Sequence, residues 1–484
     1  MGNIELSDNN AFTFSNIDGL GVKGIGDPFM LKVSPTEYYM YCTNSDSGLS
    51  VWASSDMVNW EMKGEIYSKD QDGAWGYQNF WAPEVFVKDG KYYLIYTARY
   101  EKDRLLKIGL AVSDSPAGPF TDVVKGEPFL NPTKAVIDGD VFADEDGSMY
   151  MYFVLDCSTN TVNGINTSQV YGVKLKDDLT GMDGTPVLLT TPDQQWEIET
   201  GNYVWNEGPI VIKHDATYYL VYSSSCYDNP AYSLGYATSD SPLGPFTKAE
   251  ENPVLTAVGL ENVSGSGHNN FVLSPDGTEI WASYHTHTNV KQPSGDRQCN
   301  LCRIGFTDDG KLYFNGPLVT EQPKPSGNGI TNITGSFNAT AEKTECKLLT
   351  DGAILVHAEG RYATDYELSK GLSLPVNESG VINIEMNDNT ENDDPAKNIS
   401  GIAIYPGSGS IHDIYSVKLK LDDATTTEYI LPADATAPLC LSFTGTPAKS
   451  VTVILTPSEG TNSITLSEIE LFSGDCAAVN GDVE

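Results

Sequence analysis

The chain has 484 residues, 40% hydrophobic and 20% charged, a balance typical of a globular protein of roughly two to four domains. Its 66 acidic residues against 29 basic ones give a net charge of -37. This charge excludes nucleic acid and anionic membranes as expected partners, because phosphate binding requires basic patches. No run of about 18 apolar residues is present, so the sequence predicts no transmembrane span.

The residues Met1 to Leu6 contain no basic segment followed by an apolar one, so the sequence shows no signal peptide. We expect an extracellular or cell-surface protein whose signal has been removed, with a cytoplasmic location as the alternative. We also expect a monomer. Among the eight Cys residues, Cys346 and Cys476 stand near the two ends of the C-terminal region and are candidates for a disulfide.

A short apolar run, a tight turn and a second run rich in aromatic and β-branched residues recur five times, which is the pattern of a β-hairpin. The first strands of the five hairpins begin at Asp27, Ala82, Asp138, Glu207 and His268. Further strand patterns follow each hairpin. Repeats of this length, each with about four strands, are typical of a β-propeller. Residues 1–322 are therefore predicted to form a five-bladed β-propeller, with the five strand heads in a ring at one end of its central channel.

Residues 323–336 are rich in Pro and Gly and are predicted to be a linker. Residues 337–484 differ from the repeats, because they are rich in Thr and Asp and contain at least five alternating apolar runs. This pattern, without a clear helix, predicts an antiparallel β-sandwich. The fold class expected for the whole chain is thus all-β.

Three of the five strand heads are carboxylates, namely Asp27, Asp138 and Glu207. Hydrolysis of a glycosidic bond requires an acid that protonates the leaving oxygen and a base that activates water. A third carboxylate raises the pKa of the acid by charge repulsion. Carboxylates on opposite sides of a channel leave room for a water, which predicts inversion with an acid–base spacing of about 6.5–9.5 Å.

Several other side chains belong to the predicted site. Trp81 and Trp205 come shortly before strand heads and are candidates to stack on a sugar, with packing between blades as the alternative. Arg303 offers a planar guanidinium to sugar hydroxyls, with a surface salt bridge as the alternative. Glu84 follows the head Ala82 by two residues and is expected to contact residues of the site rather than the substrate.

Two histidine positions carry different expectations. His268 is itself a strand head and is interpreted as a ligand of a metal or of a metal-bound water, with a hydrogen-bonded core residue as the alternative. His285 and His287 alternate along the following strand, so their side chains share one face. We interpret this second pair as strand packing.

The repeats resemble glycoside hydrolase family 43 over roughly residues 20 to 320. The matching phrases are Gly26-Asp27-Pro28, Trp81-Ala82-Pro83-Glu84-Val85, Ile137-Asp138, Glu207-Gly208-Pro209, Gly267-His268-Asn269 and Arg303. The resemblance implies an inverting glycosidase, either an α-L-arabinofuranosidase or a β-xylosidase, acting on plant cell-wall polysaccharides or oligosaccharides. It implies Asp27 as general base, Asp138 as the residue that tunes the pKa, and Glu207 as general acid, with a calcium ion in the channel near His268.

The C-terminal region resembles discoidin-like, galactose-binding jelly rolls of the carbohydrate-binding-module type. The matching phrases are Leu349-Thr350-Asp351-Gly352 and Leu466-Ser467-Glu468-Ile469-Glu470-Leu471-Phe472. These motifs are structural, so the resemblance leaves open whether this domain binds sugar. The alternative function for the whole chain is a catalytically inert carbohydrate-binding propeller with an appended binding module.

Overall fold

The computed structural model describes residues 4–9, 11–198, 201–354, 371–389, 395–407 and 410–477, and nearly all regular structure in them is β-strand. This confirms the all-β class. Helical structure in these residues is limited to short 3-10 turns: η1 (Gly19–Gly21), η2 (Gln195–Glu197), η3 (Thr334–Ser336), η4 (Lys347–Leu349) and η6 (Ile411–Asp413). In the same residues no helix has the length and apolar character needed to cross a membrane.

Within the described residues, the five predicted repeats each form an antiparallel sheet of four or five strands. The first two sheets are β2 (Gly26–Ser34), β3 (Glu37–Thr43), β4 (Gly48–Ser54) and β5 (Glu61–Ser68), then β6 (Gly76–Lys88), β7 (Lys91–Tyr100), β8 (Leu106–Ser113) and β9 (Thr121–Asp122). The third comprises β10 (Val136–Ala143), β11 (Met149–Leu155), β14 (Gln169–Lys174) and β15 (Val187–Thr190). The fourth comprises β17 (Glu207–His214), β18 (Thr217–Ser224), β19 (Ser233–Ser239), β20 (Thr247–Lys248) and β21 (Leu255–Thr256). The fifth comprises β22 (Gly267–Leu273), β23 (Ile280–His287), β24 (Arg297–Phe306) and β25 (Leu312–Phe314).

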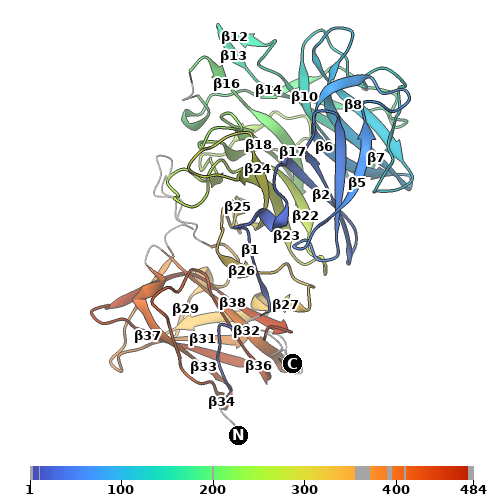
Figure 1. Cartoon of the computed structure of the whole chain (residues 1–484). Coiled ribbons are helices and arrows are strands. Elements are labelled where there is room, and N and C mark those ends of the chain that lie inside the picture. The colour runs from blue at the N-terminus through green and yellow to red at the C-terminus, as the bar shows by residue number, and fades with distance from the viewer. Residues whose placement is uncertain are drawn as a thin grey trace.

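The five sheets close into a ring, because the first strand of each contacts the first strand of the next and β22 contacts β2 (Figure 1). Strand β18 shows how the sheets pack face to face. Its residues Tyr219 and Val221 join the apolar core shared with the fifth sheet, whereas Tyr218 and Leu220 join the core shared with the third. Alternating side chains of a strand point to opposite faces, so a strand between two sheets must be apolar at nearly every position.

A small sheet extends from the ring between the third and fourth sheets. It consists of β12 (Thr161–Val162), β13 (Ile165–Thr167) and β16 (Tyr203–Val204), and β13 pairs with β16 in parallel. Figure 1 shows these strands at the end of the ring far from the C-terminal part of the chain. They lead directly into β17, which begins at Glu207.

The C-terminal part of the chain, called here the C-terminal unit, contains two further sheets in its described residues. One comprises β27 (Ile330–Asn332), β30 (Leu372–Pro375), β32 (Lys397–Pro406), β36 (Leu439–Ala448) and β38 (Ser463–Gly474). The other comprises β28 (Phe337–Ala341), β29 (Thr344–Glu345), β31 (Ile382–Asp388), β33 (Ile414–Leu421), β34 (Ala424–Thr425), β35 (Tyr429–Ile430) and β37 (Ser450–Pro457). A single apolar core joins both sheets.

The two ends of the predicted first domain differ from expectation. The described residues before β1, 4–9 and 11–12, are assigned from sequence to that domain but lie on the C-terminal unit: Ser7 pairs with Ser442, and Leu6 is buried in the C-terminal core. The chain then enters β1 (Thr13–Ser15), which pairs with β26 (Glu321–Pro323) between the two parts (Figure 1). The predicted linker is also partly wrong, because β27 lies inside residues 323–336 and pairs with β38. Its Pro and Gly content concealed a short strand.

All eight cysteines are free thiols, so Cys346 and Cys476 form no disulfide.

Candidate active site

The first strand of every sheet in the ring carries an irregularity at its head. The pairing register shifts there in β2, β6, β10, β17 and β22, as in a β-bulge. One residue in each head has a left-handed backbone, with φ between 44° and 54°: Asp27, Ala82, Asp138, Gly208 and His268. A bulge redirects side chains, and here the repeated conformation directs five equivalent positions toward one end of the ring.

The equivalent residue in the fourth sheet is Gly208 rather than the predicted Glu207. Glu207 comes one position earlier, at the position that Trp81 occupies in the second sheet. A Cβ at Gly208 would lie 2.9 Å from Nδ1 of His268, so the space beside this ring requires glycine, whereas the equivalent heads adopt the same left-handed backbone with other residues. Glu207 therefore stands one position before the left-handed residue of its strand, whereas Asp27 is itself the left-handed residue of its strand.

Asp27 is buried and surrounded by hydrogen-bond donors. Nη1 of Arg297 donates to its Oδ1 at 2.8 Å, and the Thr43 hydroxyl donates to its Oδ2 at 2.6 Å. Nδ1 of His268 lies 3.3 Å from the same Oδ1. Burial opposes ionisation, but Arg297 and the two histidines His268 and His285 together hold the pKa of Asp27 well below its usual value. Asp27 is consequently a carboxylate.

Asp138 is buried in the next acidic head. Its backbone N–H donates to the Thr97 hydroxyl at 3.0 Å, and its Oδ2 accepts the N–H of Gly208 at 3.0 Å. Burial raises the pKa of Asp138 to about 6, with Asp27 adding to the shift and His268 opposing it. Because Gly208 directly follows Glu207, Asp138 also fixes the backbone that carries Glu207.

Glu207 is buried at the start of β17. Burial is the main cause that raises the pKa of Glu207 well above its usual value, followed by the negative charges of Asp138, Asp156 and Asp27. A hydrogen bond with Tyr232 acts in the opposite direction. The structure thus combines an ionised Asp27 with a protonated Glu207, the division of roles that acid–base catalysis requires.

Sequence reasoning missed four residues of this site: Asp156, Tyr232, His285 and Arg297. The strand-packing interpretation of His285 is wrong, because its Nδ1 accepts the backbone N–H of Asp27 at 3.2 Å. Burial lowers the pKa of His285 to about 3, so this ring is neutral. Arg297 is the first residue of β24, and no sequence pattern distinguished it.

Arg303, predicted to bind sugar, lies elsewhere. Its guanidinium contacts Glu279 at 3.2 Å and also forms an ion pair with Glu470 of the C-terminal unit. Glu470 in turn accepts the Tyr405 hydroxyl at 2.7 Å. Arg303 therefore connects the ring to the C-terminal unit and is wrongly assigned to the site, and the surface alternative also fails because the pair is buried.

The two predicted tryptophans are both half-buried. Trp81 of the second sheet packs partly against the core that the third and fourth sheets share. Trp205 stacks on Tyr203, with ring centroids 6.0 Å apart and planes inclined by 18°. Contact of either ring with substrate stays a prediction.

The side chains present decide whether the protein alone could hold the expected calcium ion. In the described part of the chain, no group of three or more His, Cys, Asp or Glu side chains is placed to hold one metal ion. Calcium takes six to eight oxygen ligands, so this donor set does not match a site built from protein side chains. His268 has a defined role without a metal, as a neighbour of Asp27, and its predicted metal contact stays a prediction.

Near the predicted catalytic carboxylates, Glu84 and Asp140 form a second acidic pair. Both follow the bulges of their strands and are buried. Burial and the charge of its partner raise the pKa of Glu84 well above its usual value, and burial raises that of Asp140 to about 7. Burial therefore favours the protonated form of both groups.

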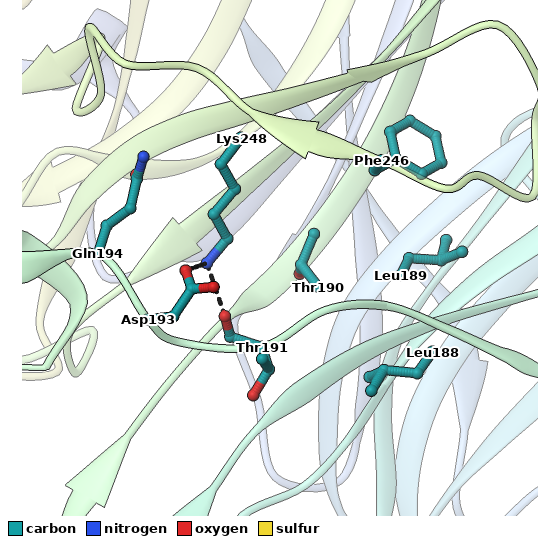
Figure 2. Close-up of a pocket in the computed structure, with 8 residues that line it drawn as sticks. All are labelled: Leu188, Leu189, Thr190, Thr191, Asp193, Gln194, Phe246 and Lys248. Carbon is teal, nitrogen blue, oxygen red and sulfur yellow. Dashed lines mark hydrogen bonds and ion pairs between the residues drawn. The ribbon is translucent and has the colours of Figure 1, made fainter.

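A hollow of about 490 Å³ lies on the flank of the ring, between the outer strands of the third and fourth sheets. Its lining consists of Leu188, Leu189, Thr190, Thr191, Asp193, Gln194, Phe246 and Lys248. Figure 2 shows the Lys248 amine directed at Asp193 and at the Thr191 carbonyl, 2.8 and 2.6 Å away. None of the three predicted catalytic carboxylates lines this hollow, so it is separate from the acid–base site.

Comparison with curated proteins finds relatives that share about half of this chain. An extracellular exo-α-(1→5)-L-arabinofuranosidase of Streptomyces avermitilis is 28% identical over 282 residues, which cover 52% of this chain and 53% of that enzyme. A xylosidase/arabinosidase 43A of Humicola insolens is 29% identical over 288 residues, 54% of this chain and 80% of that enzyme. The chain thus spans about half the length of the first relative and more of the second.

Among solved structures, a thermostable family-43 glycoside hydrolase is 44% identical, with a TM-score of 0.62. It covers 65% of this chain and is itself covered completely. The profile of glycosyl hydrolases family 43 matches residues 23–312, which contain the five sheets of the ring except the last two residues of β25. Because this match extends over more than half of the sequence, the chain belongs to glycosyl hydrolase family 43.

Proposed function

We propose that this protein hydrolyses L-arabinofuranosyl or D-xylosyl linkages in plant cell-wall polysaccharides or their oligosaccharides, with inversion. The observation that carries the proposal is the opposite protonation of two buried carboxyl groups, Asp27 and Glu207, on one rim of the ring. The printed names of two relatives, an arabinofuranosidase and a xylosidase/arabinosidase, support the two candidate sugars. The name of the first relative also supports an extracellular location.

In the proposed reaction Glu207 donates its proton to the glycosidic oxygen as the bond from the anomeric carbon to that oxygen breaks. Asp27 accepts a proton from a water whose oxygen forms the new bond to the anomeric carbon on the opposite face. The products are the free sugar and the alcohol of the leaving group. Glu207 is then ionised and Asp27 protonated, and exchange of one proton with solvent restores both.

The surrounding residues maintain these two states. Arg297 and Thr43 hold Asp27 ionised and oriented, and Asp138 adds negative charge that keeps Glu207 protonated. No step is assigned to a metal, because the side chains present do not form a calcium site. Calcium bound mainly through water beside His268 stays a prediction, to be tested by metal analysis of the purified protein.

We further propose that the ring of five sheets is a five-bladed β-propeller and that the C-terminal unit is a β-sandwich of the discoidin-like type. Closure of the first strands into a ring supports the first assignment, and a core shared by two sheets supports the second. Whether the C-terminal unit binds sugar is answered by titrating it with arabinose, xylose and galactose.

The decisive experiment compares the wild-type protein with Glu207→Gln, Asp27→Asn and the exposed control Glu145→Gln on aryl α-L-arabinofuranosides and aryl β-D-xylosides. We expect Asp27→Asn to lose at least about 100-fold in kcat/KM on every substrate, the usual contribution of a general base. Glu207→Gln should lose most of its kcat/KM on substrates with poor leaving groups and least on substrates with good ones, because only a poor leaving group needs to be protonated. Proton NMR of the first sugar anomer released tests inversion.

An inert carbohydrate-binding protein is the alternative outcome. It would be indicated if the wild type bound arabinan or xylan and cleaved neither the polymers nor the aryl glycosides. Equal activity of Glu207→Gln and wild type would overturn the assignment of the acid.

A further inference from the structure

We infer that Tyr203 and Trp205 form an aromatic shelf that binds the leaving-group side of an oligosaccharide, beyond the sugar that is cleaved. This inference rests on the proposed function. The two rings stack on each other, 6.0 Å apart at an angle of 18°. Tyr203 is 46% exposed and Trp205 is half-buried, so the pair presents an aromatic surface to solvent. Exposed aromatic surface of this kind is typical of a ligand site.

The backbone directs the shelf and the acid toward the same side. Tyr203, Trp205 and Glu207 occupy alternate positions of an extended segment, so their side chains share one face. The N–H of Ser168 donates to Val204 at 2.9 Å and the N–H of Asn206 donates to Ser168 at 3.1 Å, which continues the parallel pairing of β13 with β16. The segment is therefore extended up to the start of β17.

The shelf is held rigidly. The Ser224 hydroxyl donates to the carbonyl oxygen of Trp205 at 2.5 Å. Tyr203 pairs in register with Asn166 on β13, whose half-buried side chain stands on the same face. An amide beside an aromatic ring is suited to a neutral sugar, which offers C–H groups to the ring and hydroxyls to the amide.

The position of the shelf identifies which part of the substrate it meets. A general acid protonates the oxygen that leaves, so the leaving group lies next to Glu207. Tyr203 is four residues away in extended backbone, about 13 Å along the strand, which is farther than one sugar ring reaches. The shelf is therefore placed for the second leaving-group sugar, and it predicts that this enzyme favours oligosaccharides over aryl glycosides.

The test measures affinity in the Glu207→Gln background, so that no substrate is consumed. Linear arabino-oligosaccharides and xylo-oligosaccharides of two to six units, and an aryl glycoside, are titrated by calorimetry into Glu207→Gln and Glu207→Gln/Tyr203→Ala. We expect Tyr203→Ala to weaken binding of the longer members of one series about tenfold, a change of about 1.4 kcal/mol, and that of the aryl glycoside less than twofold. Tyr203→Phe should retain the affinity. The control is Tyr415→Ala, which removes a tyrosine that is 49% exposed on the C-terminal unit.

The outcomes separate the shelf from the proposed function. Equal losses for short and long ligands, no loss for either, or no oligosaccharide binding would each overturn the shelf. A wild type that cleaves no pentoside, with binding of long oligosaccharides that still depends on Tyr203, would refute the proposed hydrolysis and support the shelf.

Discussion

Arg297 and Asp27 are separated by 270 positions, and Nη1 of the arginine donates to Oδ1 of the carboxylate at 2.8 Å. The guanidinium also lies over the ring of Tyr227, 4.7 Å from its centroid. A Cβ at Gly26 would come within 2.0 Å of the guanidinium, so the glycine before Asp27 is needed for this contact. The contact keeps the proposed base ionised although it is buried.

Replacing this arginine should therefore impair the base. We expect Arg297→Gln to lower kcat/KM on an aryl pentoside at least about 100-fold, since loss of the positive charge affects both ionisation and orientation of Asp27. The pKa of Asp27 should rise, so the acidic limb of the pH profile of kcat/KM should move to higher pH by about one unit or more. Arg104→Gln, at an exposed arginine, is the control. An unchanged acidic limb would contradict the role given to Arg297.

Tyr232 should have the opposite effect on the alkaline limb. Its hydrogen bond lowers the pKa of Glu207, so Tyr232→Phe should raise that pKa further. The acid then stays protonated to higher pH, and the alkaline limb of kcat/KM should move upward by up to about one unit. The control Tyr38→Phe removes a hydroxyl that donates to the Leu273 carbonyl instead. A downward movement of the limb would exclude Tyr232 as the partner of Glu207.

The repeat in the sequence was enough to predict five sheets and to select Asp27, Asp138 and Glu207, because each lies at the head of a repeated hairpin. It could not predict that Gly208, rather than Glu207, occupies the left-handed position, since both residues stand at the head and only the backbone distinguishes them. The contrast between Arg297 and Arg303 is similar. Both lie on β24 and are separated by an even number of positions, so their side chains point to the same face of the strand. They are about 20 Å apart along the strand, however, so Arg297 lies at the site and Arg303 at the C-terminal unit.

Residues 4–12 could not be assigned for a different reason. The segment is short and belongs to no repeat, and its partners, such as Ser442, lie more than 400 positions away. Proximity along the chain therefore suggested the wrong domain. Contacts between two segments that are far apart in the sequence leave no periodic pattern in the sequence of either segment.

Arg303 provides a prediction about stability rather than catalysis. Arg303→Met leaves Glu279 and Glu470 without their cation in a buried site, which should cost about 3–5 kcal/mol. The double variant Arg303→Met/Glu470→Gln should recover part of this loss in denaturant unfolding. The kcat/KM of the folded single variant should equal that of the wild type within about twofold. A raised KM with unchanged stability would restore Arg303 to the sugar site.

Leu6 should stabilise the C-terminal unit, because this residue is 4% exposed in its core. Leu6→Ala should cost about 2–4 kcal/mol. All seven Trp residues lie at or before position 281, so their fluorescence reports on the ring, whereas calorimetry reports on both parts. We expect Leu6→Ala to lower the midpoint temperature of one calorimetric transition and to leave the midpoint of the transition followed by tryptophan fluorescence unchanged. Ile17→Ala, at a side chain that is 65% exposed, is the control.

Asp140 gives a prediction about pH and stability. The pKa of Asp140 is about 7 in the folded protein, and burial is the main cause, whereas in the unfolded chain its pKa is near the ordinary value of 3.8. Between these two values the folded state binds the extra proton, so the stability that this group provides is complete below about pH 4 and is lost as the pH rises toward 7.

Asp140→Asn removes that dependence while keeping a polar side chain of nearly the same size. Relative to the wild type, the variant should gain on the order of 1 kcal/mol or more between pH 4 and pH 7, with little further change above it. Urea unfolding followed by tryptophan fluorescence at several pH values measures this difference. Asp72→Asn, at a side chain that is 91% exposed, should show no such trend. A variant whose stability relative to wild type falls with rising pH would show that Asp140 is ionised in the folded protein and that burial does not raise its pKa.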